Sequence, residues 1–270
     1  MLRNKTWQYI ALASDEAFVS AAVVNLGYAG LTFATAYDRQ TGLEASFERL
    51  VPFATRMRVA EGLSVGETAF TGIRARMRLD NTAGRLALDL PGLRVEARFA
   101  QVEPWHATWP IGKKGGNETL KQMGFACEGT LRMGSRELRL DGHGMRDWTR
   151  GRPARQTAWL WSAGTARAGE RLIAWNFRTG FDDPLQLENA IWVDGRPHHP
   201  GTAQIEPGPS WRITCAGLDL HFEPQGMRRE DKNLVLVASR YQQPWGRYHG
   251  TFEGQPLTGY GVVEDHWARW

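Results

Sequence analysis

The chain has 270 residues, of which 42% are hydrophobic and 23% charged, so it is long enough for one large or two ordinary domains with a packed core. Its net charge is +4, but the basic residues alternate with acidic and apolar ones instead of forming a stripe, which excludes nucleic acid as an expected partner. Cys127 and Cys215 lie far apart without CxxC spacing, so we expect neither a zinc site nor a redox pair, and we predict no metal and no cofactor.

The first residues, MLRNKTWQYIALAS, lack the long apolar run of a signal peptide. No stretch approaches the roughly 20 apolar residues that a membrane span needs, so we expect no stable membrane insertion. The sequence therefore predicts a cytoplasmic protein. It does not indicate the oligomeric state.

The N-terminal half contains short apolar segments with a period of two. FVSAAVVNLG (18–27) and YAGLTFATAYD (28–38) form the first pair. IRARMRLD (73–80), RLALDL (85–90) and LRVEARFAQV (93–102) follow, and Asn, Pro or Gly ends the segments. Alternation interrupted by turn residues is typical of a meander of β-hairpins.

The same pattern continues to the C-terminus. Further strands are expected in EGTLRM, RELRLDG, TAWLWSAGT, RLIAWNFRT, NAIWVDG, WRITCAG, LDLHFEP, NLVLVASRYQ, GRYHGTFE and LTGYGVVED. Only NETLKQM (117–123) has helix character. The sequence therefore predicts an all-β protein with little helix, and its 12 Trp and 30 Gly fit tight turns around an aromatic-lined interior.

A weak internal repeat divides the chain into halves. The triplet that begins at Gly129 matches the one at Gly250, and Trp148 and Arg150 match Trp267 and Arg269. Each half thus ends with a hairpin followed by W-x-R, and RGRPAR (150–155) has the composition of a linker. We predict two tandem antiparallel β-barrels, an N-terminal domain over 1–152 and a C-terminal domain over 153–270. A barrel interior or the junction of two barrels is where a small ligand is expected.

The segment DGHGMRDWTRG (141–151) is the richest in chemistry-bearing residues. His143 exchanges protons near neutral pH, and Asp147 can serve as an acid, a base or the partner of a cation. The alternative is a tight turn whose polar groups only fix its own backbone. Trp148 and Arg150 recur at the end of the second half, which favours a role in closing a barrel.

A second group of candidates follows the linker. Trp159 and Trp161 share one face of a strand and can form a core wall or a stacking platform. Glu188, Asn189 and Trp192 lie ahead of or within an apolar strand, where a carboxylate in an aromatic setting can act as an acid. The alternative for Glu188 is a purely structural position, at the exposed start of a strand.

Three segments carry a resemblance to a known family: NLGYAGLTFATAYDRQTG, GHGMRDWTRGRPARQTAWLWS and LENAIWVDG. With them the chain resembles an uncharacterised bacterial domain-of-unknown-function family, DUF2804, along nearly its whole length. More remotely, it is similar to the two-barrel, lipocalin-like superfamily of carotenoid hydratases and tocopherol cyclase. This resemblance implies two lipocalin-like (calycin) barrels with a site around their junction.

The resemblance implies protonation of an alkene, with aromatic faces that stabilise a carbocation and water or a hydroxyl that adds. It would make His143, Asp147 and Glu188 the catalytic residues and Trp148, Trp159, Trp161, Asn189 and Trp192 the ligand-binding ones. The leading hypothesis is therefore an acid–base enzyme of hydratase, lyase or cyclase type, acting on a bulky hydrophobic or isoprenoid-like small molecule.

Two alternatives stay open. The first is a non-catalytic, lipocalin-like carrier of a lipid or pigment. The second is a carbohydrate-active enzyme of glycosidase type, in which indoles stack on sugars and paired carboxylates do the chemistry.

Overall fold

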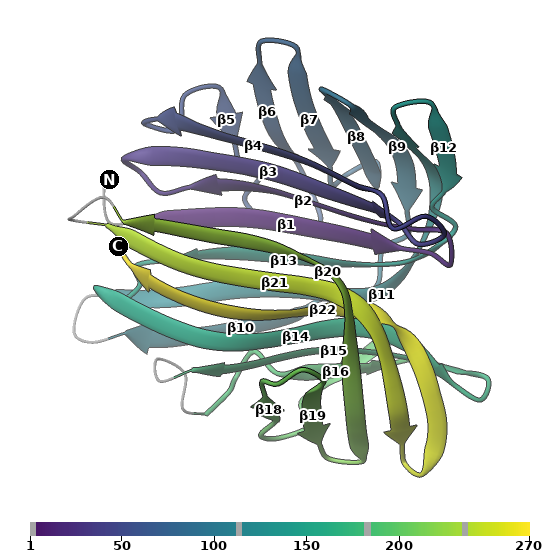
Figure 1. The fold of residues 1–270 in the computed structure, drawn as a ribbon. Helices are drawn as coiled ribbons and strands as arrows, with labels where there is room; N and C mark the ends of the chain where they lie inside the picture. Colours follow the sequence, from purple (N-terminus) through teal and green to yellow (C-terminus); the bar gives the residue numbers. More distant parts are fainter. Residues whose placement is uncertain (1–3, 112–114, 181–184, 234–236) are drawn as a thin grey trace. The chain divides into compact units, whose positions relative to one another are not determined.

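The computed structural model describes residues 4–111, 115–180, 185–233 and 237–270. Within these residues every regular element is a β-strand, which confirms the all-β prediction (Figure 1). The helix expected over 117–123 is wrong, because these residues belong to the long strand β11 (Gly115–Met133). Residues on both faces of β11 are buried between 121 and 125, so the alternation that marks a half-exposed strand is missing there.

The chain folds as two compact units. Unit 1 comprises Met1–Pro104 and Thr119–Arg152, and unit 2 comprises Trp105–Glu118 and Pro153–Trp270. The chain passes between them at 104/105, at 118/119 and at 152/153, the last within RGRPAR, whereas the sequence-based division assigns all of 105–118 to the N-terminal half. One contact that ties 105–118 to unit 2 is the hydrogen bond from the Trp105 indole N–H to the carbonyl of Leu187, at 3.0 Å. The proposal of two domains stays a prediction.

The strands of unit 1 form a curled antiparallel sheet. In spatial order the path runs β4-β3-β2-β1-β13-β11-β9-β8-β7-β6-β5, with β12 paired to β11 beside it; β10 also pairs with β11, but the residues of β10 and the first residues of β11, up to Glu118, belong to unit 2. The bounds are β1 (Lys5–Ala13), β2 (Ala17–Asn25), β3 (Ala29–Asp38), β4 (Glu44–Pro52), β5 (Met57–Arg58), β6 (Glu67–Gly72), β7 (Ala75–Asp80), β8 (Arg85–Leu90), β9 (Leu93–Phe99), β10 (Trp105–Ile111), β12 (Arg136–Arg139) and β13 (Gly142–Gly151).

Unit 2 has its own curled antiparallel sheet, in the order β17-β16-β15-β14-β22-β21-β20-β19-β18. Its strands are β14 (Gln156–Ala168), β15 (Arg171–Gly180), β16 (Ala190–Val193), β17 (Arg196–His198), β18 (Gln204–Glu206), β19 (Trp211–Cys215), β20 (Leu218–Asn233), β21 (Ala238–Phe252) and β22 (Gln255–Arg269). Strong curling of both sheets into half-barrels agrees with the predicted pair of lipocalin-like barrels.

The W-x-R repeat marks the same structural event in both units. In unit 1 the last strand, β13, pairs with the first strand, β1, and Trp148 lies opposite Gln8. In unit 2 the last strand, β22, pairs with β14, and Trp267 lies opposite Ala158. Each W-x-R therefore lies on the strand that brings the end of a unit back to its beginning.

The segment 141–151 is neither a catalytic loop nor a tight turn, because Gly142–Gly151 is a central strand. Its glycines permit close packing rather than a turn. A Cβ atom added at Gly144 would lie 2.3 Å from the ring of Phe125. The backbone polar groups of the segment are used in pairing with β1 and β11.

Each unit has an apolar core on one face of its sheet. In unit 1 the core includes Ile10, Leu12, Leu88 and Phe125. In unit 2, Trp175 extends the core over Gly164, where a Cβ would lie 2.5 Å from the indole. Because side chains alternate along a strand, the residues between these core positions line the opposite face of each sheet.

Candidate functional site

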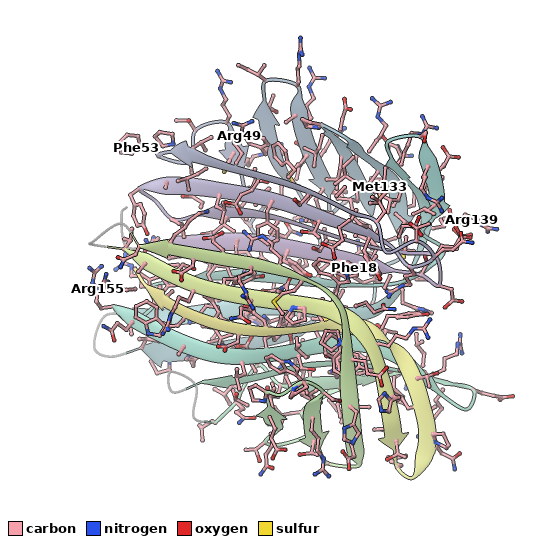
Figure 2. All side chains as sticks on the ribbon, viewed as in Figure 1. Phe18, Arg49, Phe53, Met133, Arg139 and Arg155 are labelled. Atoms are coloured by element: carbon pink, nitrogen blue, oxygen red, sulfur yellow. The ribbon has the colours of Figure 1, made fainter. Side chains whose placement is uncertain are left out.

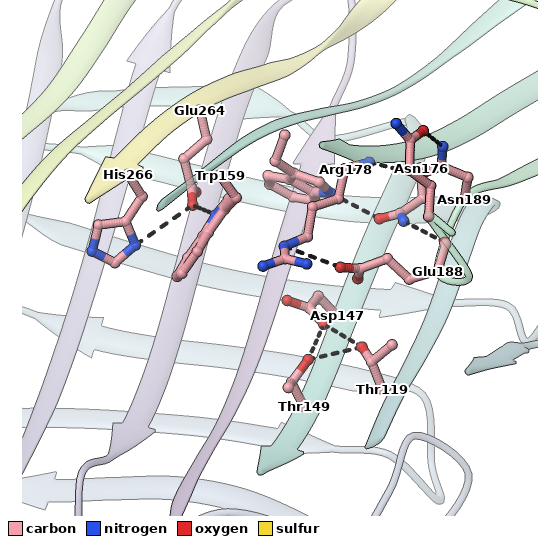
Figure 3. Close-up of polar contacts among 12 residues, drawn as sticks. Thr119, Asp147, Thr149, Trp159, Asn176, Arg178, Glu188, Asn189, Glu264 and His266 are labelled. Atoms are coloured by element: carbon pink, nitrogen blue, oxygen red, sulfur yellow. Dashed lines mark hydrogen bonds and ion pairs between the residues drawn. The ribbon is translucent and has the colours of Figure 1, made fainter. Parts of the chain in front are cut away.

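The opposite face of the unit 2 sheet carries charged and aromatic side chains. Strand register places Arg178 beside Trp161, Trp161 beside Glu264, and Trp159 beside His266. Residues directly opposite each other on paired strands project from the same face. These side chains come from β14, β15 and β22, and we call this set the polar face of unit 2 (Figure 3).

A buried ion pair lies at the centre of the polar face. Arg178 Nε is 3.2 Å from Glu188 Oε1, and the two side chains are only 9% and 3% exposed. The guanidinium also lies against two indoles, at 5.2 Å from the ring centre of Trp159 and 5.8 Å from that of Trp109. Arginine combines bonding to a carboxylate with stacking on aromatic faces, and both restrict where Glu188 can point.

The segment that carries Glu188 is fixed by side-chain amides. Asn176 Nδ2 donates to the backbone carbonyl of Glu188 at 2.8 Å, and the Arg178 N–H donates to Asn189 Oδ1 at 2.8 Å. Gln186 accepts a hydrogen bond from Asn189 Nδ2 at 2.6 Å. Trp161 donates its indole N–H to Asn176 Oδ1 at 2.8 Å. Glu188 is thus held at a defined position without being on a strand.

A second carboxylate lies on β22. Glu264 accepts hydrogen bonds from the indole N–H of Trp159 and the amide of Gln243, both at 2.8 Å. It is buried, with 7% of its surface exposed. The donors differ in kind from the partner of Glu188, because an indole and an amide are neutral. The polar face therefore holds one carboxylate next to a cation and one next to neutral donors.

His266 occupies an aromatic enclosure beside Glu264. Its ring centre is 4.4 Å from that of Trp159 and 5.1 Å from that of Tyr241, and Nδ1 is 4.0 Å from Glu264 Oε1. The other ring nitrogen, Nε2, is 3.1 Å from the Ser239 hydroxyl. Burial lowers the pKa of His266 to about 3, with smaller contributions from Arg228 and Arg178. The imidazole is therefore neutral at physiological pH.

Unit 1 places Asp147 in a separate polar group on the face opposite its core. Asp147 accepts from Lys121 Nζ at 2.8 Å, from the Trp7 indole N–H at 2.9 Å and from the Thr149 hydroxyl at 3.0 Å. Thr119 also contacts Asp147, at 3.3 Å (Figure 3). The predicted carboxylate is thus the shared acceptor of four side chains, an arrangement that fixes its orientation.

The remaining predicted residues of unit 1 differ in burial. His143 lies opposite Ala13 on the same face of β13 as Asp147, four residues away, which is about 13 Å along a strand. Trp148 projects to the other face, is 1% exposed, and donates its indole N–H to the Ala60 carbonyl at 2.7 Å. Their catalytic and ligand-binding roles stay predictions.

A buried arginine that the sequence did not indicate lies on the core side of β13. Arg146 is fully buried, and its Nη atoms donate to the side-chain oxygens of Asn81 at 3.0 Å, Gln101 at 2.7 Å and Gln122. Its guanidinium is 4.6 Å from the ring centre of Phe99. Burial lowers the pKa of Arg146 to about 9. These three partners are neutral, which is unusual for a charge inside a protein.

The structure brings the second group of sequence candidates into one unit. Glu188, Asn189 and the indoles of Trp159, Trp161 and Trp192 belong to unit 2, whereas His143, Asp147 and Trp148 belong to unit 1. Trp192 is buried and lies opposite Ala174.

Sequence reasoning missed four residues of the polar face: Arg178, Gln243, Glu264 and His266. Three of them had a visible signal. Arg178 alternates with Phe177 in the strand LIAWNFRTG, and Glu264 and His266 alternate in VVEDHWARW, so polar groups there share a face opposite the apolar residues.

Among the described residues, no cluster of three or more His, Cys, Asp or Glu side chains has the geometry to hold a metal ion. The described part of the chain also has no helix that is long and apolar enough to cross a membrane.

Comparison with known proteins identifies a family and a fold. A family model described as "Domain of unknown function (DUF2804)" matches residues 1–270. No curated protein gave a significant match.

Solved structures share the fold at low sequence identity. Kievitone hydratase from Nectria haematococca has a TM-score of 0.62 and 14% identity, with 97% of this chain and 88% of that chain covered. An AttH-type protein from Nitrosomonas europaea has a TM-score of 0.62 and 11% identity, over 98% and 92% of the two chains. CghA has a TM-score of 0.63 and 12% identity, over 97% and 87%, and was also solved with Sch210972.

Proposed function

The chain belongs to the DUF2804 family, and we propose that it is an enzyme that processes a small molecule by acid–base chemistry at the polar face of unit 2. The reaction class that we propose is hydration, its reverse, or cyclisation of a bulky hydrophobic substrate. The observation that carries the proposal is the pair of buried carboxylates, Glu188 and Glu264, held among indoles on one sheet face.

The cost of burying these charges supports a catalytic role. Removing a carboxylate or a guanidinium from water costs several kcal/mol per ion, and an ion pair often stabilises a fold no more than apolar residues of similar volume would. Unit 2 already has an apolar core on its other face. Ionisable groups that a fold does not require, held in an aromatic setting, are typical of functional sites.

The two carboxylates suit different tasks. Glu188 is held in an ion pair with Arg178, so we assign it the role of proton acceptor or electrostatic stabiliser. Glu264 accepts hydrogen bonds from the Trp159 indole and the Gln243 amide, and we assign it the role of proton donor. The faces of Trp109 and Trp159 would pack on an apolar substrate and stabilise positive charge that develops on it.

The likeness to kievitone hydratase supports this reaction class, because a hydratase adds water across a double bond. In that chemistry an acid delivers a proton to one carbon and a water oxygen bonds to the other, while a base takes the proton that the water loses. The catalytic roles of His143 and Asp147 in unit 1 stay separate predictions.

Activity-based metabolite profiling in D₂O tests the proposal. The purified protein is incubated with fractionated apolar extracts, and mass spectrometry follows substrates and products. We expect a substrate to be consumed and a product to form that is heavier or lighter by one water or of unchanged composition. Hydration or cyclisation should place deuterium at carbon, because a solvent deuteron adds to the double bond, whereas loss of water should not. Glu264→Gln should lower the rate about 100-fold or more, because general acid catalysis contributes on that order.

Glu223→Gln is the matched control, since Glu223 is an exposed carboxylate of unit 2. It should keep full activity. Retention of an unchanged apolar ligand by the wild-type protein and by Glu264→Gln alike would establish a carrier instead. Release of sugars from glycoside-containing fractions would establish the carbohydrate-active alternative.

A further inference from the structure

Unit 1 exposes large apolar side chains at two neighbouring turns. Phe53 is 73% exposed in the turn between β4 and β5, and Ile73 is 82% exposed in the turn between β6 and β7. They are the two most exposed of the large hydrophobic side chains in the described residues. Single exposed apolar residues are common, but two at adjoining tips form a feature that calls for a partner.

Strand pairing brings the two turns to the same end of the sheet. Met57 lies opposite Phe70 in the antiparallel pair β5–β6, and the Thr71 N–H donates to the Arg56 carbonyl at 3.0 Å. The turn that precedes β5 and the turn that follows β6 are therefore neighbours. Figure 2 shows Phe53 at the end of β4, with its ring outside the sheet. We call the residues Phe53, Arg56, Ile73 and Arg74 the tip patch.

The turn at Phe53 has a defined conformation that is held by a hydrogen bond and by packing. Phe53 and Ala54 both adopt the left-handed conformation, with φ of 53° and 52°. The Phe53 N–H donates to the Tyr28 carbonyl at 3.0 Å, and Ala54 is buried over Gly30, where an added Cβ would lie 2.7 Å from the Ala54 Cα. The turn therefore directs one apolar side chain inward and the larger one into solvent.

The residue types at both tips are not those that the backbone favours. Arg56 and Arg74 are also left-handed, with φ of 65° and 53°, where glycine, asparagine or aspartate is the usual choice. Turn formation alone would select small polar residues here. Each tip instead combines an exposed apolar side chain with an arginine.

The charges of the tip patch are available to a partner. Arg56 and Arg74 are exposed, and neither forms an ion pair with another described residue. The nearby Arg58 and Arg78 differ, because both pair with Glu67. The tip patch thus has a net positive charge around two apolar side chains.

We propose that the tip patch binds the surface of a bilayer that contains anionic lipids. Apolar side chains that enter the headgroup region, flanked by arginines that face lipid phosphates, are the features of interfacial binding. A soluble acidic protein would match the charges, but it would not by itself call for two apolar side chains at the most exposed points. The proposal concerns unit 1 alone and does not depend on the proposed function of unit 2.

Vesicle flotation tests the proposal with the full chain. Vesicles of phosphatidylcholine alone are compared with vesicles that also contain phosphatidylglycerol, at low and high salt. We expect the wild-type protein to float with the anionic vesicles and to be released by high salt. Phe53→Ser with Ile73→Ser should weaken binding about tenfold or more, and Arg56→Gln with Arg74→Gln by a similar factor.

Two controls lie in the same unit. Val65→Ser removes an apolar side chain that is 64% exposed at the other end of β5 and β6, and Arg98→Gln removes an exposed arginine of β9. Both should bind like the wild type. Equal flotation of the wild type and the Phe53/Ile73 variant, or no flotation at all, would overturn the proposal. If the wild type is a dimer and this variant a monomer by light scattering, the tip patch is instead an interface between two copies.

Discussion

Each unit buries one arginine against aromatic rings, but the two arginines have different partners. Arg146 in unit 1 donates to amide oxygens and lies over Phe99 on the core side of its sheet. Arg178 in unit 2 pairs with the carboxylate of Glu188 on the face away from the core. Amide oxygens cannot exchange protons at physiological pH, whereas a carboxylate can. We therefore expect a structural role for Arg146 and, under the proposed function, a chemical one for Arg178.

The largest effect is expected at Arg146. Arg146→Ala leaves the side-chain oxygens of Asn81, Gln101 and Gln122 buried without their donor, so we expect a loss of about 4 kcal/mol and a Tm lower by about 10 °C. Calorimetry and urea titration measure both quantities. A Tm within a few degrees of the wild type would mean that Arg146 contributes little to the stability of unit 1.

The stability losses caused by substituting Glu188 and Arg178 should not be additive, and neither the single variants nor the double variant should retain turnover. Glu188→Gln leaves a buried guanidinium without its carboxylate and should cost about 3 kcal/mol. The double variant with Arg178→Gln should lose at least about 1 kcal/mol less stability than the sum of the losses of the two single variants. It should not regain turnover. A double variant with full activity would remove both residues from the proposed mechanism.

Acid should destabilise unit 2 through His266. Its folded-state pKa, about 3, lies below the value near 6.5 of an unfolded chain, so the unfolded state binds the proton first. Stability is complete above pH 6.5 and falls as the pH decreases toward 3, by up to about 1.4 kcal/mol per pH unit. Urea titrations between pH 7 and pH 5 measure the slope. His266→Gln should flatten it, and an unchanged slope in that variant would assign the acid sensitivity elsewhere.

The smallest effect distinguishes the two thiols. Burial raises the pKa of Cys127 in unit 1 to about 12, and it raises the pKa of the partly exposed Cys215 in unit 2 as well. A disulfide reagent should label Cys215 slowly in the folded protein and leave Cys127 unmodified. Arg146→Ala should speed the labelling of Cys127 in particular. Equal acceleration at both cysteines would show that the two units unfold together.

Much of the fold could be predicted from local patterns. Alternation in segments such as IRARMRLD and LRVEARFAQV corresponds to β7 and β9, because a strand with one exposed face shows its period directly. The repeat of W-x-R indicated where each unit closes. Strands could not be predicted at 117–123 and at 142–151, because strands that are covered on both faces do not alternate between apolar and polar residues.

The candidate site was only partly predictable. Glu188, Trp159 and Trp161 stood out by residue type, and the structure places them on the polar face of unit 2. Glu264 did not stand out, because its importance depends on Trp159, 105 residues earlier. The pairing of Arg178 with Glu188 could not be predicted either, because it depends on a loop that the side chains of Asn176 and Asn189 hold in place.

The sequence by itself determined most strands and their turns, those at 117–123 and 142–151 excepted, because these depend on side-chain alternation and turn residues within a few positions. Only the tertiary structure decided which charges are buried and with which partner. Arg146 and Arg178 look alike in the sequence, each being an arginine that follows a large apolar residue, Met145 or Phe177. The tertiary arrangement of loops and strands brings neutral amides to one and a carboxylate to the other, and no local pattern contains that arrangement.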